Sequence, residues 1–285
     1  MLGLIDHGLV GRHSLNSDNP KHLDDTYKIY FGLGQSLDFI HSPNVFKVSL
    51  AGIRLGHYLM RKFDSSFSDK RILDVGTGSG VHALLMRKLG NHDITATDIS
   101  EHSIEQAKMH ERMNFHQHAI SFLTSDLFSS LPERQFQTII FNPPGWRTPS
   151  ASLTQRLKSI EQEGEMPIQS MFYGEEVIRR FLHDLPRYLS PTGTAVVGFN
   201  SMVGISDVLS KYNQSHQDTP PLAYRLMERH TLPLLYYSDH WRMISNALNK
   251  EFEHWSKQDM AAYSIDKNGE IFWSYEIIEF FHRTK

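Results

Sequence analysis

The 285-residue sequence contains no cysteine, which excludes disulfide bonds and thiolate metal sites and favours a reducing compartment. It has no run of about 18 apolar residues, the length that a membrane-spanning helix requires. The first twenty residues lack a basic stretch followed by an apolar one, so they do not resemble a secretory signal. These absences predict a cytoplasmic protein with no membrane partner.

Neither sign of charge is in large excess. The 29 lysines and arginines face 32 aspartates and glutamates, a formal net charge of −3, so the basic excess typical of nucleic-acid binders is missing. The 17 histidines are scattered and form no zinc-type pair, so no metal site is predicted. Nothing in the sequence indicates an oligomeric state.

Apolar residues in the middle of the chain follow a regular alternation. Residues 45–63 have helical spacing, and the later helices are predicted at 81–89, 101–114 and 175–189. Short apolar runs predict strands at 71–75, 93–97, 120–123, 138–141 and 194–199. Strands that alternate with helices are typical of a parallel sheet covered by helices on both faces.

The two ends of the chain differ from this pattern. In residues 1–44 the spacing of Tyr27, Tyr30 and Phe31 predicts short helical pieces, which act as a lid or simply pack. Near the C-terminus we expect strands within 222–237, a helix at 241–257 and a hairpin at 261–281. The predicted fold class is α/β: a Rossmann-like doubly wound sheet, mostly parallel with an antiparallel terminal hairpin, plus a short N-terminal helical segment.

A glycine-rich segment, Asp74-Val75-Gly76-Thr77-Gly78-Ser79-Gly80, directly follows the first predicted strand. Glycines at this point let the backbone approach a ligand closely and turn sharply into the next helix. The third glycine comes one place too early for the dinucleotide fingerprint, and Val81 occupies the expected position. We therefore expect an adenosine-containing ligand other than NAD.

Three further polar signals follow the next predicted strands. Asp98 lies about twenty positions beyond the glycines, where an acidic residue commonly accepts hydrogen bonds from ribose hydroxyls. Asp126 follows the third strand, and Asn142-Pro143-Pro144 follows the fourth. Ligands bind open α/β sheets at the carboxyl ends of their strands, so the four signals together predict one site.

These motifs, over roughly residues 45–200, resemble those of class I S-adenosylmethionine-dependent methyltransferases. The Asn142-Pro143-Pro144 segment is similar to that of the branch that contains HemK-type protein-glutamine and N6-adenine methyltransferases. The resemblance implies S-adenosylmethionine as cofactor and methyl transfer to an amide or amine nitrogen. It also implies that residues 45–285 form the cofactor-binding catalytic domain, preceded by the segment 1–44.

The resemblance assigns roles by position. The glycine segment would wrap the methionine part of the cofactor through Gly76, Thr77, Gly78 and Gly80, with Asp74 toward the amino group. Asp98 would hold the ribose, with Ile99 among the cofactor contacts, and Asp126 with Leu127 the adenine. Asn142 would contact the cofactor and, with the carbonyl of Pro143, accept hydrogen bonds from the target nitrogen. Two acceptors aimed at its hydrogens would orient that nitrogen for attack.

The sequence departs from this branch at Gly145, where an aromatic residue usually stacks on a planar target. The neighbouring Trp146 either takes that place or packs in a core. Tyr173, in the long stretch 147–173, is a candidate catalytic residue that would reach the site from a loop. The missing aromatic residue weakens the case for a flipped base as target.

Several functions remain open from the sequence. The favoured one is methylation of a nitrogen in a small-molecule or protein acceptor, with nucleic acid less favoured. The alternative is a synthase that cyclises the cofactor's aminobutyrate arm to azetidine-2-carboxylate and methylthioadenosine, so that Asn142 would hold the cofactor's own amine. A non-catalytic cofactor sensor is a third hypothesis, which the intact Asn142-Pro143-Pro144 segment argues against.

Overall fold

The computed structural model of the chain divides into two compact units, Met1–Phe141 and Asn142–Lys285, and each is described by itself. It describes residues 9–11, 26–63, 68–160, 168–235 and 242–283. The start of the helix predicted at 241–257 lies outside these ranges. No helix in the described part of the chain is long and apolar enough to cross a membrane.

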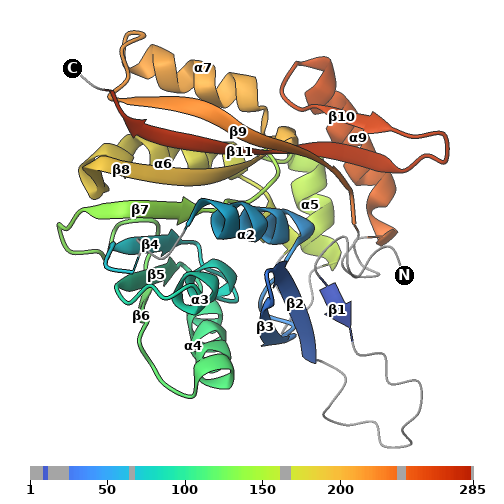
Figure 1. The fold of residues 1–285 in the computed structure, drawn as a ribbon. Helices are drawn as coiled ribbons and strands as arrows, with labels where there is room; N and C mark the ends of the chain where they lie inside the picture. The colour runs from blue at the N-terminus through green and yellow to red at the C-terminus, as the bar shows by residue number, and fades with distance from the viewer. Residues whose placement is uncertain (1–8, 12–25, 64–67, 161–167, 236–241, 284–285) are drawn as a thin grey trace, which may run out of the picture. The chain divides into compact units, whose positions relative to one another are not determined.

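The first unit begins with a three-stranded antiparallel sheet rather than with helices (Figure 1). Its strands are β1 (Leu9–Gly11), β2 (Thr26–Gly32) and β3 (Gln35–Ile40), in the order β1-β2-β3. The prediction of short helical pieces in residues 1–44 is therefore wrong for the described part of that segment.

The burial pattern of β2 explains the error. Tyr27, Ile29 and Phe31 are buried and alternate with more exposed residues, the period of two that a strand requires. Tyr30, which suggested a helical face, is 39% exposed. The turn to β3 passes through residues 32–34, all with positive φ, which a helix does not allow. Of the two predicted roles for these aromatic residues, packing holds for Tyr27 and Phe31.

Four parallel strands follow in the first unit. They are β4 (Ile72–Val75), β5 (Ile94–Asp98), β6 (Ser121–Thr124) and β7 (Phe136–Phe141), paired in the order β7-β4-β5-β6 (Figure 1). All four residues of β4 are buried, as expected for a central strand covered on both faces. These strands confirm the predicted ones to within two residues at each end.

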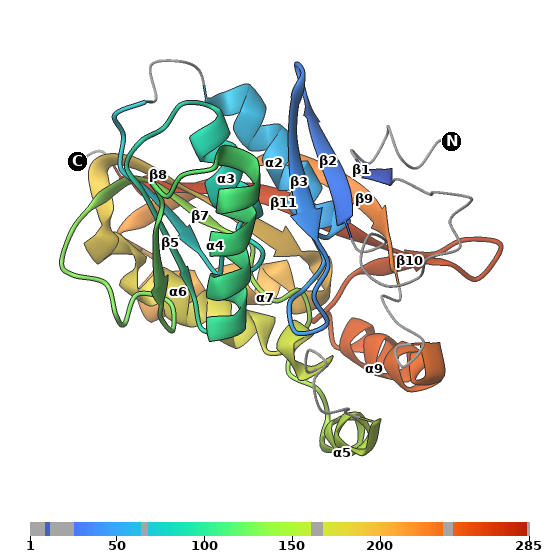
Figure 2. The ribbon, with the colours of Figure 1, turned by 90° about the horizontal axis from the view of Figure 1, so that it is seen from below.

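Three helices follow in the first unit: two pack against these strands (Figure 2), and the first one packs against the second and against β2. They are α2 (Leu50–Lys62), α3 (Val81–Lys88) and α4 (Glu101–Phe115), close to their predicted bounds. Helix α4 begins at Ser100, whose hydroxyl accepts a hydrogen bond from the backbone N–H of Ser103, and Glu101 complements the positive end of the helix. Helix α3 begins after Gly80, which has positive φ.

The second unit contains antiparallel strands and six helical segments in its described part. The α-helices are α5 (Ala151–Ile160), α6 (Gly174–Tyr188), α7 (Ile205–Ser215) and α9 (Ser245–Lys257), with 3-10 turns η2 (Ile168–Met171) and η3 (Ser201–Val203). The strands are β8 (Leu189–Asn200), β9 (Leu222–Pro233), β10 (Tyr263–Ile265) and β11 (Ile271–His282). Strand β11 pairs antiparallel with the other three (Figure 1), which confirms the predicted terminal hairpin. Helices α5 and α7 were not predicted.

A cluster of buried apolar residues joins α5 and α9 in the second unit. Trp146 is 2% exposed and lies edge-on against Phe172 and Phe252, with both ring centroids 5.2 Å away. Of the two hypotheses for Trp146, the structure supports packing in a core. It does not replace the aromatic residue that is missing at position 145.

Gly56 offers a test of how α2 packs in the first unit. A Cβ atom at this position would lie 2.5 Å from a ring carbon of Phe31, so the helix contacts β2 through a surface that admits no side chain. Gly56→Ala should lower the free energy of unfolding by about 1–3 kcal/mol through overpacking. Urea denaturation measures this loss, and a Phe31→Leu background should reduce it. An alanine variant as stable as the parent would contradict the packing.

Candidate active site

The glycine segment after β4 forms a tight loop with three glycines in the left-handed region. Gly76, Gly78 and Gly80 have φ of 62°, 54° and 86°. A Cβ at Gly80 would lie 3.0 Å from the side chain of Ala107, whereas no atom lies within 4 Å of a Cβ at Gly78. The backbone at Gly78 therefore faces open space that a side chain would fill. This arrangement fits a ligand that approaches the main chain closely.

The side chain of Asp74 stabilises the loop through hydrogen bonds. Its Oδ2 accepts hydrogen bonds from the Thr77 hydroxyl at 2.6 Å and from the Ala83 backbone N–H at 3.1 Å. The side chain is 1% exposed, and this burial raises the pKa of the carboxyl group. Asp74 thus ties the loop to the first turn of α3, in addition to the cofactor contact predicted for it.

Asp98, the last residue of β5, reaches the same loop. Its Oδ2 accepts from the Gly78 backbone N–H at 2.8 Å and its Oδ1 from the Ser100 N–H at 2.9 Å. Each carboxylate oxygen has a second lone pair, so both can also accept from ligand hydroxyl groups. Burial raises the pKa of Asp98, and the two N–H bonds oppose that shift. The structure therefore brings together two of the predicted site residues that are twenty positions apart.

The remaining predicted cofactor contacts lie at the ends of β5 and β6. The Ser125 backbone N–H donates to the carbonyl of Asp98 at 2.8 Å, which places the Asp126–Leu127 turn beside the end of β5. Ile99 is 71% exposed, while Leu127 is buried and has a positive φ of 51°. An exposed isoleucine next to Asp98 offers an apolar surface for a flat ring.

His110 supports the loop and was not among the predicted residues. The Ile40 backbone N–H can only donate, so Nε2 of His110 accepts from it at 3.0 Å, and Nδ1 then donates to the Ser79 carbonyl at 2.8 Å. Burial lowers the pKa of His110, in agreement with this neutral form. The histidine lies in a helix with no distinctive motif, so nothing in the sequence marks it.

In the second unit, Asn142 is the first residue after β7, and its side chain is anchored. Asn142 Oδ1 accepts a hydrogen bond from the hydroxyl of Tyr275 on β11 at 2.9 Å. Asn142, Pro143 and Pro144 are each partly exposed, whereas Gly145 is buried. The segment is thus partly accessible to solvent, and its first side chain is held by a buried tyrosine.

Backbone hydrogen bonds connect this segment to the residues at the start of α6. Trp146 N–H donates to the Met171 carbonyl at 2.9 Å, and Gly174 N–H donates to the Trp146 carbonyl at 2.7 Å. A Cβ at Gly174 would overlap the carbonyl oxygen of Pro144. Tyr173, which caps α6 with a positive φ of 65°, is thereby held next to the segment and is 36% exposed.

The structure also gives a reason for the missing aromatic residue. A Cβ at Gly145 would lie 2.6 Å from Nδ2 of Asn200, at the end of β8. The Oδ1 of Asn200 accepts from the Met202 backbone N–H at 2.9 Å, so this side chain is held in place. Asn200 therefore fills the space into which a residue larger than glycine would extend.

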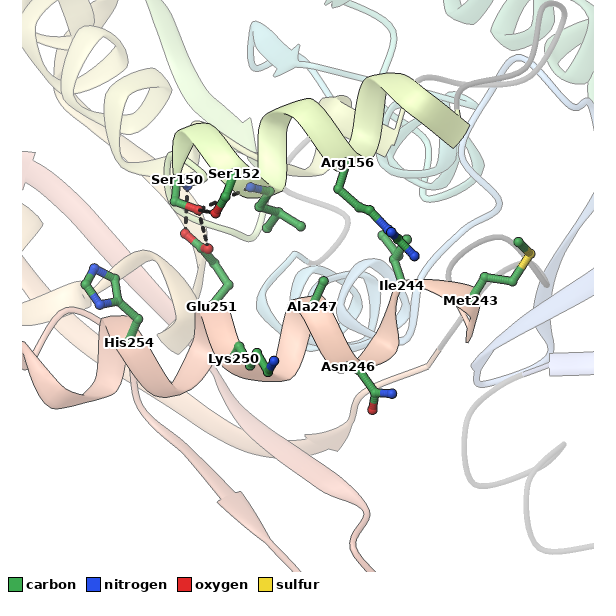
Figure 3. A pocket seen from close by; sticks show the side chains of 11 residues that line it. Ser150, Ser152, Arg156, Met243, Ile244, Asn246, Ala247, Lys250, Glu251 and His254 are labelled. Atoms are coloured by element: carbon green, nitrogen blue, oxygen red, sulfur yellow. Dashed lines mark hydrogen bonds between the residues drawn. The ribbon is translucent and has the colours of Figure 1, made fainter.

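A cavity of about 600 Å³ lies between α5 and α9 in the second unit (Figure 3). Glu251 projects toward α5, and its carboxylate accepts from the backbone N–H and the hydroxyl of Ser150, each at 2.7 Å. No predicted site residue lines this cavity, so it is not the predicted cofactor site.

Comparisons with known proteins agree with this arrangement. Residues 36–161 match the sequence model of the methyltransferase small domain family. A release factor glutamine methyltransferase of Rhodopirellula baltica is 30% identical over 52% of this chain and 50% of that protein. The chain is thus similar in sequence to methyltransferases over the part that carries the glycine segment, Asp98 and Asn142. A Methanocaldococcus jannaschii protein assigned as an N5-glutamine methyltransferase is 28% identical over 50% of this chain and 68% of that one.

The chain also resembles solved structures. A 16S rRNA N2 G1207 methyltransferase of Thermus thermophilus superimposes with a TM-score of 0.51 at 16% identity, over 88% of this chain and 48% of that one. This likeness confirms the predicted Rossmann-like α/β class. The chain spans about half the length of the Rhodopirellula relative.

The Asp98 contacts predict the effect of removing that carboxylate. Asp98→Ala should weaken binding of S-adenosylhomocysteine by about 1–3 kcal/mol, because ligand hydroxyls and the Gly78 and Ser100 N–H groups lose their acceptor. Isothermal titration calorimetry measures this change. Asp69→Ala, which removes an exposed aspartate, is the control and should bind normally. Equal affinity in both variants would contradict the assignment of Asp98.

Proposed function

We propose that this chain transfers the methyl group of S-adenosylmethionine to the side-chain amide nitrogen of a glutamine in a protein. The observation that carries the proposal is the partly exposed, anchored Asn142 directly after β7, in an intact Asn142-Pro143-Pro144 segment. The two sequence relatives described above are named as glutamine methyltransferases, which supports an amide as target. They lend no support to a small-molecule acceptor or to cyclisation of the cofactor.

The residues at the strand ends of the first unit fit the cofactor. The open space before Gly78 would take its methionine part, and the remaining lone pairs of Asp98 would accept from the ribose hydroxyls. Ile99 and Leu127 would contact the adenine, with Asp126 accepting from its amino group. When bound, S-adenosylmethionine supplies an electrophilic methyl group on a sulfonium. Residues 45–285 would then form the catalytic domain predicted from the sequence.

Asn142 and Pro143 would act on the target nitrogen. An amide nitrogen is a weak nucleophile because its lone pair is delocalised into the carbonyl group. If Asn142 Oδ1 and the Pro143 carbonyl each accept one of its N–H groups, the lone pair of a pyramidal nitrogen points toward the methyl group. As the nitrogen–methyl bond forms, the sulfur–methyl bond would break and S-adenosylhomocysteine would leave. The same two acceptors would stabilise the positive charge on the nitrogen until one of its protons passes to solvent. Tyr173, held beside this segment, would line the path of the acceptor.

The environment of Gly145 favours an amide over a nucleobase. Recognition of a flipped base relies on stacking against aromatic side chains. Here Asn200 lies where the aromatic residue would extend, and Trp146 is buried in a core. A glutamine side chain can instead be held by hydrogen-bond acceptors such as Asn142 Oδ1 and the carbonyl of Pro143. The near-balanced charge of the chain agrees with a protein acceptor.

Asn142→Ala tests the proposal. It should lower kcat by about 100- to 1,000-fold, the typical cost of removing one oriented polar group at a reacting centre, and leave cofactor affinity nearly unchanged. Turnover of a release factor with radiolabelled cofactor, together with calorimetry, measures both quantities. Asn142→Asp keeps an acceptor and should retain more activity than the alanine variant.

Asn213→Ala is the matched control. Its side chain also bonds a tyrosine hydroxyl, that of Tyr224, at 3.1 Å, but it lies on α7 and outside the site. This variant should keep full kcat. If Asn142→Ala instead keeps its kcat, or loses cofactor binding and stability together, Asn142 does not act on the acceptor.

A further inference from the structure

Tyr275 is a buried tyrosine whose hydroxyl has one partner in the site. It lies on β11, opposite Asn200 in the antiparallel register with β8, and is 1% exposed. A hydroxyl group without a hydrogen bond is costly in such a place. The Tyr275 hydroxyl meets this need by donating to Asn142 Oδ1 at 2.9 Å, across 133 positions of sequence.

The neighbouring strand is shaped to permit this contact. A Cβ at Gly198 on β8 would overlap the Tyr275 hydroxyl and lie 2.9 Å from Asn142 Oδ1. Any other residue at position 198 would therefore separate the two side chains. The ring of Tyr275 also lies perpendicular to that of Trp273, with centroids 6.0 Å apart, which limits its movement.

The Tyr275 hydroxyl is a permanent donor. Burial alone raises the pKa of the phenol far above its ordinary value, so the group stays protonated over the whole working range of pH. One lone pair of Asn142 Oδ1 is thus occupied by Tyr275, and the second stays available for an N–H of the acceptor. The amide of Asn142 is fixed by a bond on its buried side and does not rotate freely about χ2.

We propose that Tyr275 is a positioning residue for methyl transfer: its hydroxyl holds the Asn142 amide in the orientation in which Oδ1 receives the target N–H. This inference rests on the proposed function of Asn142. Gly145 has no side chain that could contact the acceptor and restrain it. The orientation of the target nitrogen therefore depends on the Asn142 amide, which the Tyr275 hydroxyl holds by a hydrogen bond.

Tyr275→Phe removes the hydroxyl and keeps the ring. Because an amide that rotates freely adopts the productive orientation only part of the time, kcat should fall about 10- to 100-fold. The acceptor KM and the affinity for S-adenosylhomocysteine should stay within about twofold of the parent values, since ground-state contacts are retained. Tyr224→Phe breaks the other tyrosine–asparagine bond and is the control, with kcat expected unchanged.

A double mutant separates positioning from a general structural role. In the Asn142→Ala background, Tyr275→Phe should cause no further loss of kcat, because the group that it positions is absent. An equal loss in both backgrounds, or a kcat of Tyr275→Phe equal to that of the parent, would overturn the inference and leave the proposed function standing. Full activity of Asn142→Ala would instead remove the proposed function itself.

The mobility of the Asn142 side chain provides a second measurement, which does not depend on kcat. Nuclear magnetic resonance relaxation of the Asn142 side-chain amide should give an order parameter near that of rigid backbone, about 0.85. In folded Tyr275→Phe it should fall below about 0.6, the range of flexible groups. A mobile Asn142 amide in the parent protein would contradict the inference directly.

Discussion

The geometry of the first unit depends on one carboxylate that two backbone N–H groups share. Asp98 accepts from Gly78 in the loop after β4 and from Ser100 at the start of α4, so one side chain joins two strand ends and a helix. Burying a charged group is unfavourable, and these bonds offset part of that cost. The left-handed loop, the open space before Gly78 and the exposed Ile99 all lie next to this carboxylate in the chain or through its hydrogen bonds.

In the second unit, the side-chain oxygen of Asn142, directly after β7, is held by the hydroxyl of Tyr275. Small residues make this possible, because Gly145, Gly174 and Gly198 each lie where a Cβ would strike a neighbouring group. Backbone hydrogen bonds at Trp146 fix the segment to the start of α6, and Tyr275 fixes its first side chain. Rigid support of this kind is what a site that works by orientation requires.

The sequence predicts this protein well where its patterns are local. Alternating apolar runs locate β4 to β8, and the glycine segment, Asp98 and Asn142 mark the ends of strands. The prediction is wrong in residues 26–32, where the sequence is compatible with both a helical and a strand period. Tyr27, Tyr30 and Phe31 have helical spacing, but the residues that are buried there alternate with a period of two. Contacts such as Tyr275 with Asn142 or Asn200 with Gly145 join distant parts of the chain, so no local pattern predicts them.

The proposed function requires that a glutamine amide receives the methyl group. Its most direct test is tandem mass spectrometry of release factor incubated with the full chain and S-adenosylmethionine that carries a trideuterated methyl group. The account predicts one trideuteromethyl group on the side-chain nitrogen of a glutamine, with S-adenosylhomocysteine formed only when the acceptor is present. Methylthioadenosine formed from cofactor alone, or label found only in added tRNA or ribosomal RNA, would contradict it.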